Sequence, residues 1–141
     1  MANKGYIAFD TAVIGAGAAG FMAAITAARN GRSVAIIEHK DRPGKKILAT
    51  GNGKCNFTNE RMGTEYFRGD KKLIETSLGK FTERDTIEFL NGIGVAARNK
   101  NGYYYPNSES AASVLKALEM EAKRLGIRVY TSVEILDIKT G

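Results

Sequence analysis

Three glycines near the N-terminus have the spacing that a nucleotide diphosphate requires. They form a G-x-G-x-x-G run that follows an apolar stretch and leads into an alanine-rich segment. In such a run the first glycine permits a tight turn, the second lets the backbone approach the phosphates, and the third lets a helix pack close to a strand. The free N–H groups at the start of that helix favour an anion. The residues assigned to this turn are Gly15, Ala16, Gly17, Ala18, Ala19 and Gly20.

The elements around the glycines follow one another in the order of a βαβ unit. Residues 7–14 predict a buried strand, residues 21–30 a helix that ends at a glycine, and residues 33–37 a second apolar strand. Glu38 follows this second strand, 18 residues after Gly20. An acid at about this distance holds a ribose by its hydroxyls. A βαβ unit without a ligand is the alternative interpretation.

The composition is that of a soluble globular protein. The chain has 141 residues, of which 43% are hydrophobic and 26% charged, so that one domain with a core is expected. We expect a cytoplasmic protein without a membrane partner, because the sequence lacks a bilayer-length apolar run and a cleavable signal pattern. The single cysteine, Cys55, excludes an internal disulfide and agrees with a reducing compartment.

The net charge of +6 leaves a nucleic-acid partner open as an alternative. The basic residues cluster just after Glu38, where only Asp41 is acidic. The cluster comprises Lys40, Arg42, Lys45, Lys46 and Lys54. Positive charge beside a ribose acid serves a diphosphate as well as a nucleic-acid backbone, so we favour the nucleotide. A solvated basic loop is the other interpretation.

The central part of the chain combines a long loop with helical and strand patterns. Residues 39–69 show little periodicity and predict a functional loop. Thr82 and Asp85 predict the capped start of a helix. Residues 95–98 and 103–105 predict a β-hairpin around an Asn-Gly turn.

The last forty residues predict a return to the parallel sheet. Apolar residues at helical spacing from Ala111 predict a helix capped by Ser108. Residues 127–131 predict a third parallel strand and residues 133–138 the start of another. Because a doubly wound domain needs further strands and crossovers, we expect the N-terminal part of a longer protein. A small complete domain is the alternative.

The spacing does not separate FAD from NAD, because both bind a diphosphate at such a turn and use an acid on the ribose. NADP is less favoured, since Glu38 would repel a ribose phosphate, although His39 and Lys40 keep it open. One histidine and one cysteine give no familiar metal set, and no Ser-His-Asp arrangement is evident. The catalytic residues and the oligomeric state are left open.

Three segments resemble the BaiN-type bacterial flavoproteins, also described as aminoacetone oxidase-like or NAD(P)/FAD-dependent oxidoreductases. These segments are residues 13–24, residues 44–59 and residues 105–114, and the second is the most specific. The resemblance implies an α/β, Rossmann-like FAD-binding domain of glutathione-reductase type, with a central parallel sheet and a β-hairpin excursion. It also implies that the domain is incomplete, with its remaining strands and a substrate domain absent from these residues.

The resemblance further implies where FAD would lie. Glu38 would bind the adenosine ribose, Lys45 and Lys46 would lie along the cofactor, and Val133 would contact the adenine. The loop from Thr50 would lie near the phosphates or the flavin end. The residues assigned beyond the first turn are Glu38, His39, Lys45, Lys46, Gly51, Asn52, Gly53, Cys55, Asn56 and Val133.

The resulting hypothesis is the FAD-binding portion of a flavin-dependent oxidoreductase. It would transfer hydride or electrons between a small organic substrate and NAD(P)H or oxygen. An RNA-modification-type flavoprotein and a non-catalytic NAD-binding module are the alternatives. Cys55 is interpreted as a small residue in a tight loop, because a redox-active disulfide would require a second cysteine.

Overall fold

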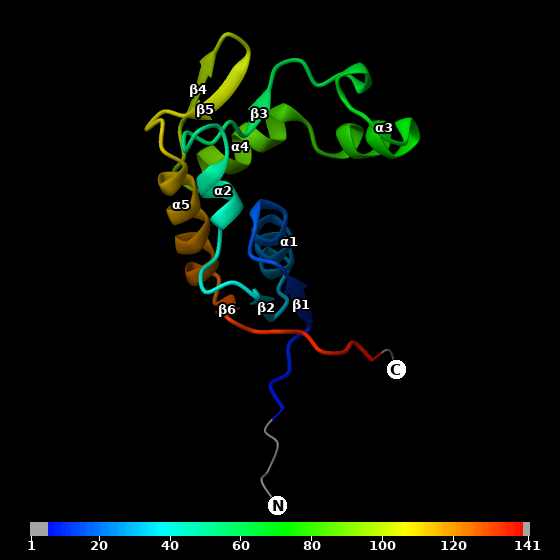
Figure 1. Cartoon of the computed structure of the whole chain (residues 1–141), viewed down its shortest axis with the longest axis vertical. Coiled ribbons are helices and arrows are strands. Elements are labelled where there is room, and N and C mark those ends of the chain that lie inside the picture. The colour runs from blue at the N-terminus through cyan, green and yellow to red at the C-terminus, as the bar shows by residue number, and fades with distance from the viewer. Residues whose placement is uncertain (1–5, 140–141) are drawn as a thin grey trace, which may run out of the picture. The chain divides into compact units, whose positions relative to one another are not determined.

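The computed structural model describes residues 6–139, which form two compact units (Figure 1). The first unit is discontinuous along the chain and combines the residues up to Lys46 with those from Leu118 onward. The second unit is the continuous segment Ile47–Ala117. The second unit is therefore an insertion of about seventy residues between the two parts of the first unit.

A three-stranded parallel sheet forms the centre of the first unit. Its strands are β1 (Thr11–Ile14), β2 (Val34–Ile37) and β6 (Arg128–Tyr130), in the order β1-β2-β6. Thr11 pairs with Val34, and Ala35 pairs with Arg128. The helix α1 (Ala18–Arg29) connects the first two strands. The predicted α/β, Rossmann-like architecture with a parallel sheet is thereby confirmed.

Helix α1 covers one face of this sheet. Phe21, Ala24 and Ile25 are completely buried, as is Ile36 on β2. These apolar side chains recur at helical spacing on α1, so that one stripe of the helix meets the sheet. Asn30 and Gly31 end the helix, and Gly31 has a φ of +79°.

An apolar hollow lies on the other face of the sheet. It is lined by Ile7, Ala8, Phe9, Ala12, Ala35, Ile37, Tyr130 and Val133. The rings of Phe9 and Tyr130 meet edge to face with centroids 6.3 Å apart. Ile14 is 61% exposed, so the prediction of a buried strand over residues 7–14 was wrong in length and in burial. The strand begins only at Thr11, because only there does a partner strand supply hydrogen bonds.

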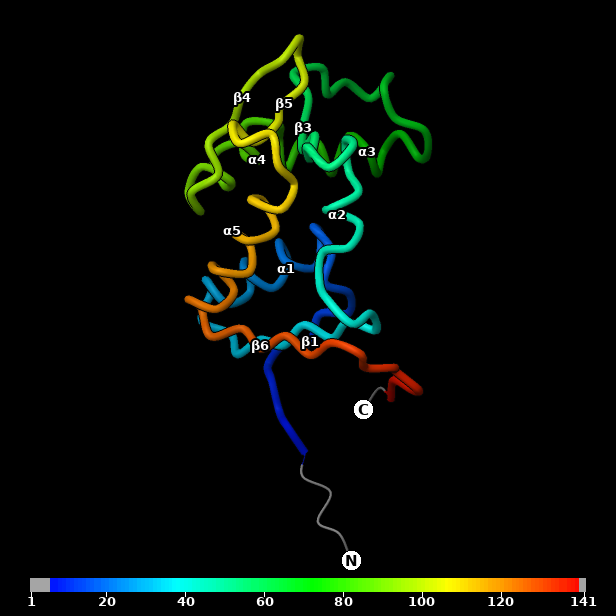
Figure 2. Tube along the Cα trace, turned by 60° about the vertical axis from the view of Figure 1, so that its left-hand side comes forward, coloured from blue at the N-terminus to red at the C-terminus, as the bar shows by residue number. Residues whose placement is uncertain are grey.

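The segment that follows β6 stays close to the sheet for a few residues. Ser132 N–H donates to the carbonyl oxygen of Lys40 at 2.8 Å, and Val133 N–H donates to that of Glu38 at 3.0 Å. Figure 2 shows the chain then running on past β1. The predicted strand over residues 133–138 does not form. The described residues offer it no partner strand, and Leu136 is 89% exposed.

The second unit is built on a small antiparallel sheet of order β3-β5-β4 (Figure 2). Strands β4 (Ala97–Lys100) and β5 (Tyr103–Pro106) form the predicted hairpin, shifted slightly along the chain. Asn101 and Gly102 both have positive φ, as a two-residue hairpin turn requires. Strand β3 (Thr58–Asn59) pairs with β5 on the other side.

The helices of the second unit confirm some predictions and correct others. Helix α4 (Glu83–Gly92) begins at the expected capping box, in which Thr82 and Asp85 bond to each other's backbone N–H groups. Helix α5 (Ala111–Arg124), which runs from the second unit into the first, forms as predicted and buries the apolar stripe Ala111, Val114, Leu115, Leu118 and Ala122. The assignment of Ser108 as its cap was wrong, because Glu109 adopts a φ of +50° and delays the helix.

Several short elements were not predicted from the sequence. Helix α2 (Lys45–Ala49), β3 and the 3-10 turn η1 (Thr64–Tyr66) all fall inside the predicted loop 39–69. Each is shorter than the window in which periodicity becomes visible. Helix α3 (Lys71–Lys80) was also missed, and it has no buried residue. A helix without a buried face shows only a weak apolar stripe in the sequence.

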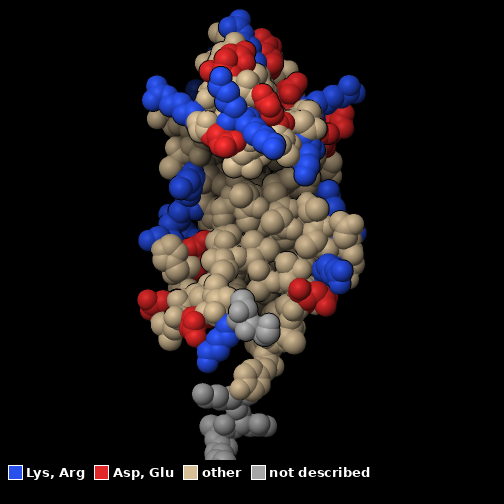
Figure 3. All heavy atoms as spheres, turned by 90° about the vertical axis from the view of Figure 1, so that its right-hand side faces the viewer, with Lys and Arg blue, Asp and Glu red and all other residues tan. Residues whose placement is uncertain are grey.

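The surface is charged with both signs. On the face shown in Figure 3, acidic side chains lie among the basic ones. Among the residues that the structure describes, no helix combines the length and the apolar character needed to cross a membrane.

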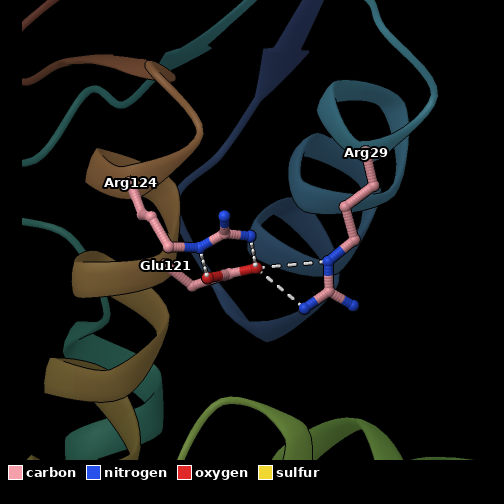
Figure 4. Close-up of polar contacts among 3 residues, drawn as sticks. All are labelled: Arg29, Glu121 and Arg124. Atoms are coloured by element: carbon pink, nitrogen blue, oxygen red, sulfur yellow. Dashed lines mark hydrogen bonds and ion pairs between the residues drawn. The ribbon is translucent and has the colours of Figure 1, made fainter.

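An ion cluster ties the end of α1 to the second half of α5 within the first unit (Figure 4). Glu121 is 8% exposed and receives hydrogen bonds from Arg29 at 2.8 and 3.2 Å and from Arg124 at 2.7 and 2.9 Å. The bonds from Arg124, and next those from Arg29, lower the pKa of Glu121 to about 2. The chain that returns from the second unit is thus fastened to α1.

Candidate nucleotide-binding site

A pocket of about 670 Å³ lies at the carboxyl ends of β1 and β2. In open parallel sheets this is the edge at which ligands bind. The pocket brings together eight of the predicted site residues: Gly15, Ala16, Gly17, Glu38, His39, Lys45, Lys46 and Val133. Residues from four separate stretches of chain therefore converge on one cavity of the first unit.

The glycines of the first turn leave open space where a ligand could approach. Gly15 has a φ of +97°, and its N–H donates to the carbonyl oxygen of Ile37 at 2.8 Å. A Cβ placed on Gly15 or on Gly17 would meet no heavy atom within 4 Å. Gly20 differs, because a Cβ there would lie 3.0 Å from the carbonyl carbon of Gly15 and closer still to its oxygen. Gly20 therefore permits the close approach of α1 to the turn.

The start of α1 presents unpaired amides beside this turn. Gly17 is the N-cap and offers no side chain to the first turn of the helix, which contains no acidic residue. The first N–H groups of a helix have no partner within it. Phe21 N–H is the first to bond back, to the carbonyl oxygen of Gly17 at 3.0 Å. Together with the helix dipole, these amides favour a bound anion.

Glu38 is bonded directly to the turn. Its Oε2 accepts from the N–H of Ala16 at 2.8 Å, and its Oε1 accepts from the N–H of Lys40 at 2.8 Å. These two backbone donors, that of Lys40 first, hold the pKa of Glu38 below its ordinary value. His39 Nδ1 lies 3.1 Å from Oε1. The carboxylate is buried and lies where the turn meets the end of β2.

Gly44 is a pocket residue that the sequence analysis missed. Its N–H donates to the carbonyl oxygen of Ala16 at 2.8 Å, and its φ is +71°. The dipeptide Pro43-Gly44 is a common turn signal and could have marked this position. Other lining residues that were not assigned are Ile14, Ile37, Lys40, Arg42, Glu134 and Ile135.

The pocket is lined by basic, acidic and apolar residues. The basic residues Lys40, Arg42, Lys45 and Lys46 outnumber the two acids Glu38 and Glu134. Lys45 forms an ion pair with Asp41 at 2.6 Å, and this hydrogen bond lowers the pKa of Asp41. The larger apolar lining residues are Ile14, Ile37, Val133 and Ile135. Such a combination suits a ligand with an anionic group and a flat ring.

The remaining predicted site residues lie elsewhere. Ala18 and Ala19 are exposed on the first turn of α1, and Gly20 packs against Gly15. Five others belong to the second unit: Gly51, Asn52, Gly53, Cys55 and Asn56. There the side-chain amide of Asn56 donates to the carbonyl oxygens of Thr58 and Tyr104. Burial raises the pKa of the Cys55 thiol, which is 6% exposed. A role of this loop in cofactor binding stays a prediction.

Comparison with known proteins assigns the chain to a family. Residues 9–141 match the Rossmann domain of HI0933-like proteins. The chain belongs to the HI0933-like family. Its predicted likeness to the BaiN-type flavoproteins is confirmed.

The chain has relatives that are named for two different activities. It is 45% identical over 130 residues to a 3-dehydro-bile acid delta(4,6)-reductase of Clostridium scindens, covering 90% of the chain and 32% of that protein. It is 32% identical over 131 residues to a ribosomal RNA dihydrouridine synthase of Escherichia coli, covering 92% of the chain and 33% of that protein. The chain therefore spans about a third of the length of these relatives.

Solved structures with the same fold are more distant. The HI0933-like chain matches 3-ketosteroid-delta4-(5alpha)-dehydrogenase from Rhodococcus jostii with a TM-score of 0.65 and 17% identity, over 88% of the chain and 38% of that structure. It matches glycine oxidase from Bacillus cereus with a TM-score of 0.53 and 17% identity, over 95% and 50%. At these identities the likeness establishes the fold alone.

Proposed function

We propose that the chain is the FAD-binding part of a flavin-dependent oxidoreductase and that its pocket receives the ADP half of the cofactor. The observation that carries this proposal is the bond between Glu38 and the turn. A buried carboxylate, an open glycine bend and the free amides of α1 meet in one pocket. A diphosphate and its attached ribose require these groups side by side.

The residues of the pocket fit the parts of this cofactor. The diphosphate would lie at Gly17 and the start of α1, and the ribose hydroxyls would donate to Glu38. The adenine would contact Val133, and Lys45 and Lys46 would lie along the cofactor. Bound FAD would supply hydride or electron transfer, while the protein orients the ring and keeps side reactions out.

The parent protein is proposed to be longer than these 141 residues. The support is the relatives, of which the chain spans about a third. The further strands of the FAD domain and a substrate domain would then lie in the remaining polypeptide. The glycine-rich loop with Gly51, Asn52, Gly53, Cys55 and Asn56 would lie near the phosphates or the flavin end.

The activities for which the relatives are named support a proposed substrate class. A delta(4,6)-reductase saturates carbon–carbon double bonds, and a dihydrouridine synthase adds two hydrogens to uridine. Both activities add a hydride and a proton across a double bond. We therefore propose a reductive reaction on an unsaturated small molecule, in which NAD(P)H supplies the hydride through the flavin. Oxygen would be the electron acceptor only if the substrate were oxidised instead.

The visible spectrum of the longest natural form of the protein tests the cofactor. We expect the bands of oxidised flavin in the wild type and their loss in Glu38→Ala. Glu88→Ala removes an exposed carboxylate from α4 and should keep the bands. A colourless wild type whose spectrum changes with NADH would instead favour a nicotinamide nucleotide.

RNA modification is the second candidate, because the Escherichia coli relative is named as a ribosomal RNA enzyme and the chain carries a net charge of +6. The greater identity to the bile acid reductase and the mixture of charges on the face in Figure 3 favour the small molecule. Tight RNA binding that weakens steeply with salt would reverse this preference.

A further inference from the structure

We propose that Gly44, which lies outside the glycine run, is a positioning residue for the nucleotide. With Glu38 it fixes the two peptide groups that meet at Ala16, and so sets which backbone groups face the diphosphate. This inference rests on the proposed nucleotide-binding function.

Ala16 is held from both sides by residues from beyond β2. Its N–H donates to Glu38 Oε2 at 2.8 Å, and its carbonyl oxygen accepts from the N–H of Gly44 at 2.8 Å. Ala16 is only 1% exposed. The bond to Glu38 fixes the Gly15–Ala16 peptide, and the bond from Gly44 fixes the Ala16–Gly17 peptide. Two consecutive peptide groups of the bend are thus fixed by separate partners.

Because the peptide group is planar, the bond from Gly44 orients more than the carbonyl that accepts it. In a trans peptide the carbonyl and the following N–H point in opposite directions. The bond from Gly44 to the carbonyl of Ala16 therefore also sets the direction of the N–H of Gly17. A rotation of this peptide would exchange the two groups and could turn a carbonyl oxygen, instead of a donor, toward an anion. Glycine on both sides of Ala16 offers little resistance to such a rotation.

The segment that supplies Gly44 is closed into a ring of hydrogen bonds with the bend. Glu38 accepts from Lys40 through one carboxylate oxygen and from Ala16 through the other. Gly44 then bonds back to Ala16. The turn, the acid and the loop that carries Lys45 and Lys46 are therefore one bonded assembly. The bend depends on a residue 28 positions away from Ala16.

The backbone of Gly44 limits what can replace it. Its φ of +71° lies in the left-handed region, where a side chain is strained. Gly126 has a φ of +72°, lies in the same unit and does not line the nucleotide pocket. A Cβ on Gly126 would meet no heavy atom within 4 Å. Gly126→Ala therefore reproduces the backbone strain of Gly44→Ala without touching the bend.

Titration of the cofactor-free, longest natural form with ADP tests the inference. ADP carries the diphosphate and the ribose but no flavin ring. We expect both variants to lower the midpoint of thermal unfolding by a few degrees. Gly44→Ala should weaken ADP binding about tenfold or more, whereas Gly126→Ala should stay within about twofold of the wild type. Equal affinities in the two variants would overturn the role of Gly44.

Amide hydrogen exchange of the wild type provides a second measurement that needs no variant. The N–H groups of Ala16 and Gly44 should both be protected before any ligand is added, and rapid exchange at Gly44 would overturn the inference. A wild type that binds neither ADP nor FAD would contradict the proposed function. If both amides were still protected, the two hydrogen bonds that fix Ala16 would nevertheless be confirmed.

Discussion

The chain contains two glycine-rich turns that look alike in sequence and differ in what their backbone groups do. The first, from Gly15 to Gly20, leaves open space at two glycines and free amides at the start of α1. The second, from Thr50 to Asn56, is closed on itself. Cys55 N–H donates to the carbonyl oxygen of Thr50 at 2.9 Å.

The second turn also bonds to elements of its own unit. The carbonyl oxygen of Gly53 accepts from the N–H of Ala111 at 2.7 Å, and Asn56 donates to Tyr104. A Cβ on Gly51 would lie 2.9 Å from the backbone nitrogen of Asn56. In the first turn Gly15 and Gly17 leave open space for the proposed ligand, whereas Gly51 makes room for the backbone at Asn56. The type of residue is the same, and the partner that approaches it differs.

The largest effect is expected at Gly20. Gly20→Ala forces its Cβ against the carbonyl of Gly15, so α1 must move away from β1. We expect the free energy of unfolding to fall by about 2–3 kcal/mol, and bound FAD to be lost with it. Gly79→Ala in α3 is the matched control, because nothing lies within 4 Å of its Cβ. It should be neutral or stabilising by up to about 1 kcal/mol in urea unfolding. A Gly20→Ala protein as stable as the control would contradict the close packing of the first turn.

The next largest effect is expected at Glu121, whose partner Arg29 lies in the last turn of α1. Glu121→Ala leaves Arg29 and Arg124 without their shared carboxylate. We expect a loss of about 2–3 kcal/mol in the free energy of unfolding. Glu88→Ala, in the exposed pair with Arg84, should cost less than about 0.5 kcal/mol. If urea unfolding showed equal losses of free energy in Glu121→Ala and Glu88→Ala, burial would not strengthen the ion pairs of Glu121.

The first turn was predictable because its pattern is local. Strand, glycine spacing, helix and acid follow within about thirty residues, and the structure places Glu38 at the bend. Elements with a local signal also emerged correctly, such as the capping box at Thr82 and the turn at Asn101 and Gly102. In each case the residues that specify the feature are neighbours along the chain.

The remainder was not predictable for a related reason. Pro43-Gly44 marks a turn in the sequence, but the bond from the Gly44 N–H to Ala16 is a long-range contact without a sequence signature. The predicted strand after Val133 has strand-like residues but no partner among those described. Helix α3 buries no residue, so its sequence shows little apolar periodicity. These features depend on contacts between residues that are far apart in the sequence, and the local sequence pattern does not indicate such contacts.

The stability of the first unit should depend on pH through Glu121. Its pKa is lowered from 4.5 to about 2, so the unfolded chain binds this proton first as the pH falls. The stabilisation is complete above about pH 4.5 and is lost as the pH falls toward 2, by about 2 kcal/mol. In Glu121→Gln this part of the decline should disappear from urea unfolding curves. Glu38 and Asp10, whose pKa values are also lowered, keep the remaining slope in the same direction. An unchanged slope in the variant would show that Glu121 is not the group responsible.

The smallest effect is expected at Cys55, inside the closed second turn. Its thiol is buried, and burial raises its pKa, so little thiolate is available to a reagent. We expect a maleimide to modify the native protein at least about tenfold more slowly than the urea-unfolded protein. Cys55→Ala should retain FAD, because a small side chain is all that the turn requires there. Loss of the flavin bands in Cys55→Ala would instead show that the thiol itself is needed for cofactor binding.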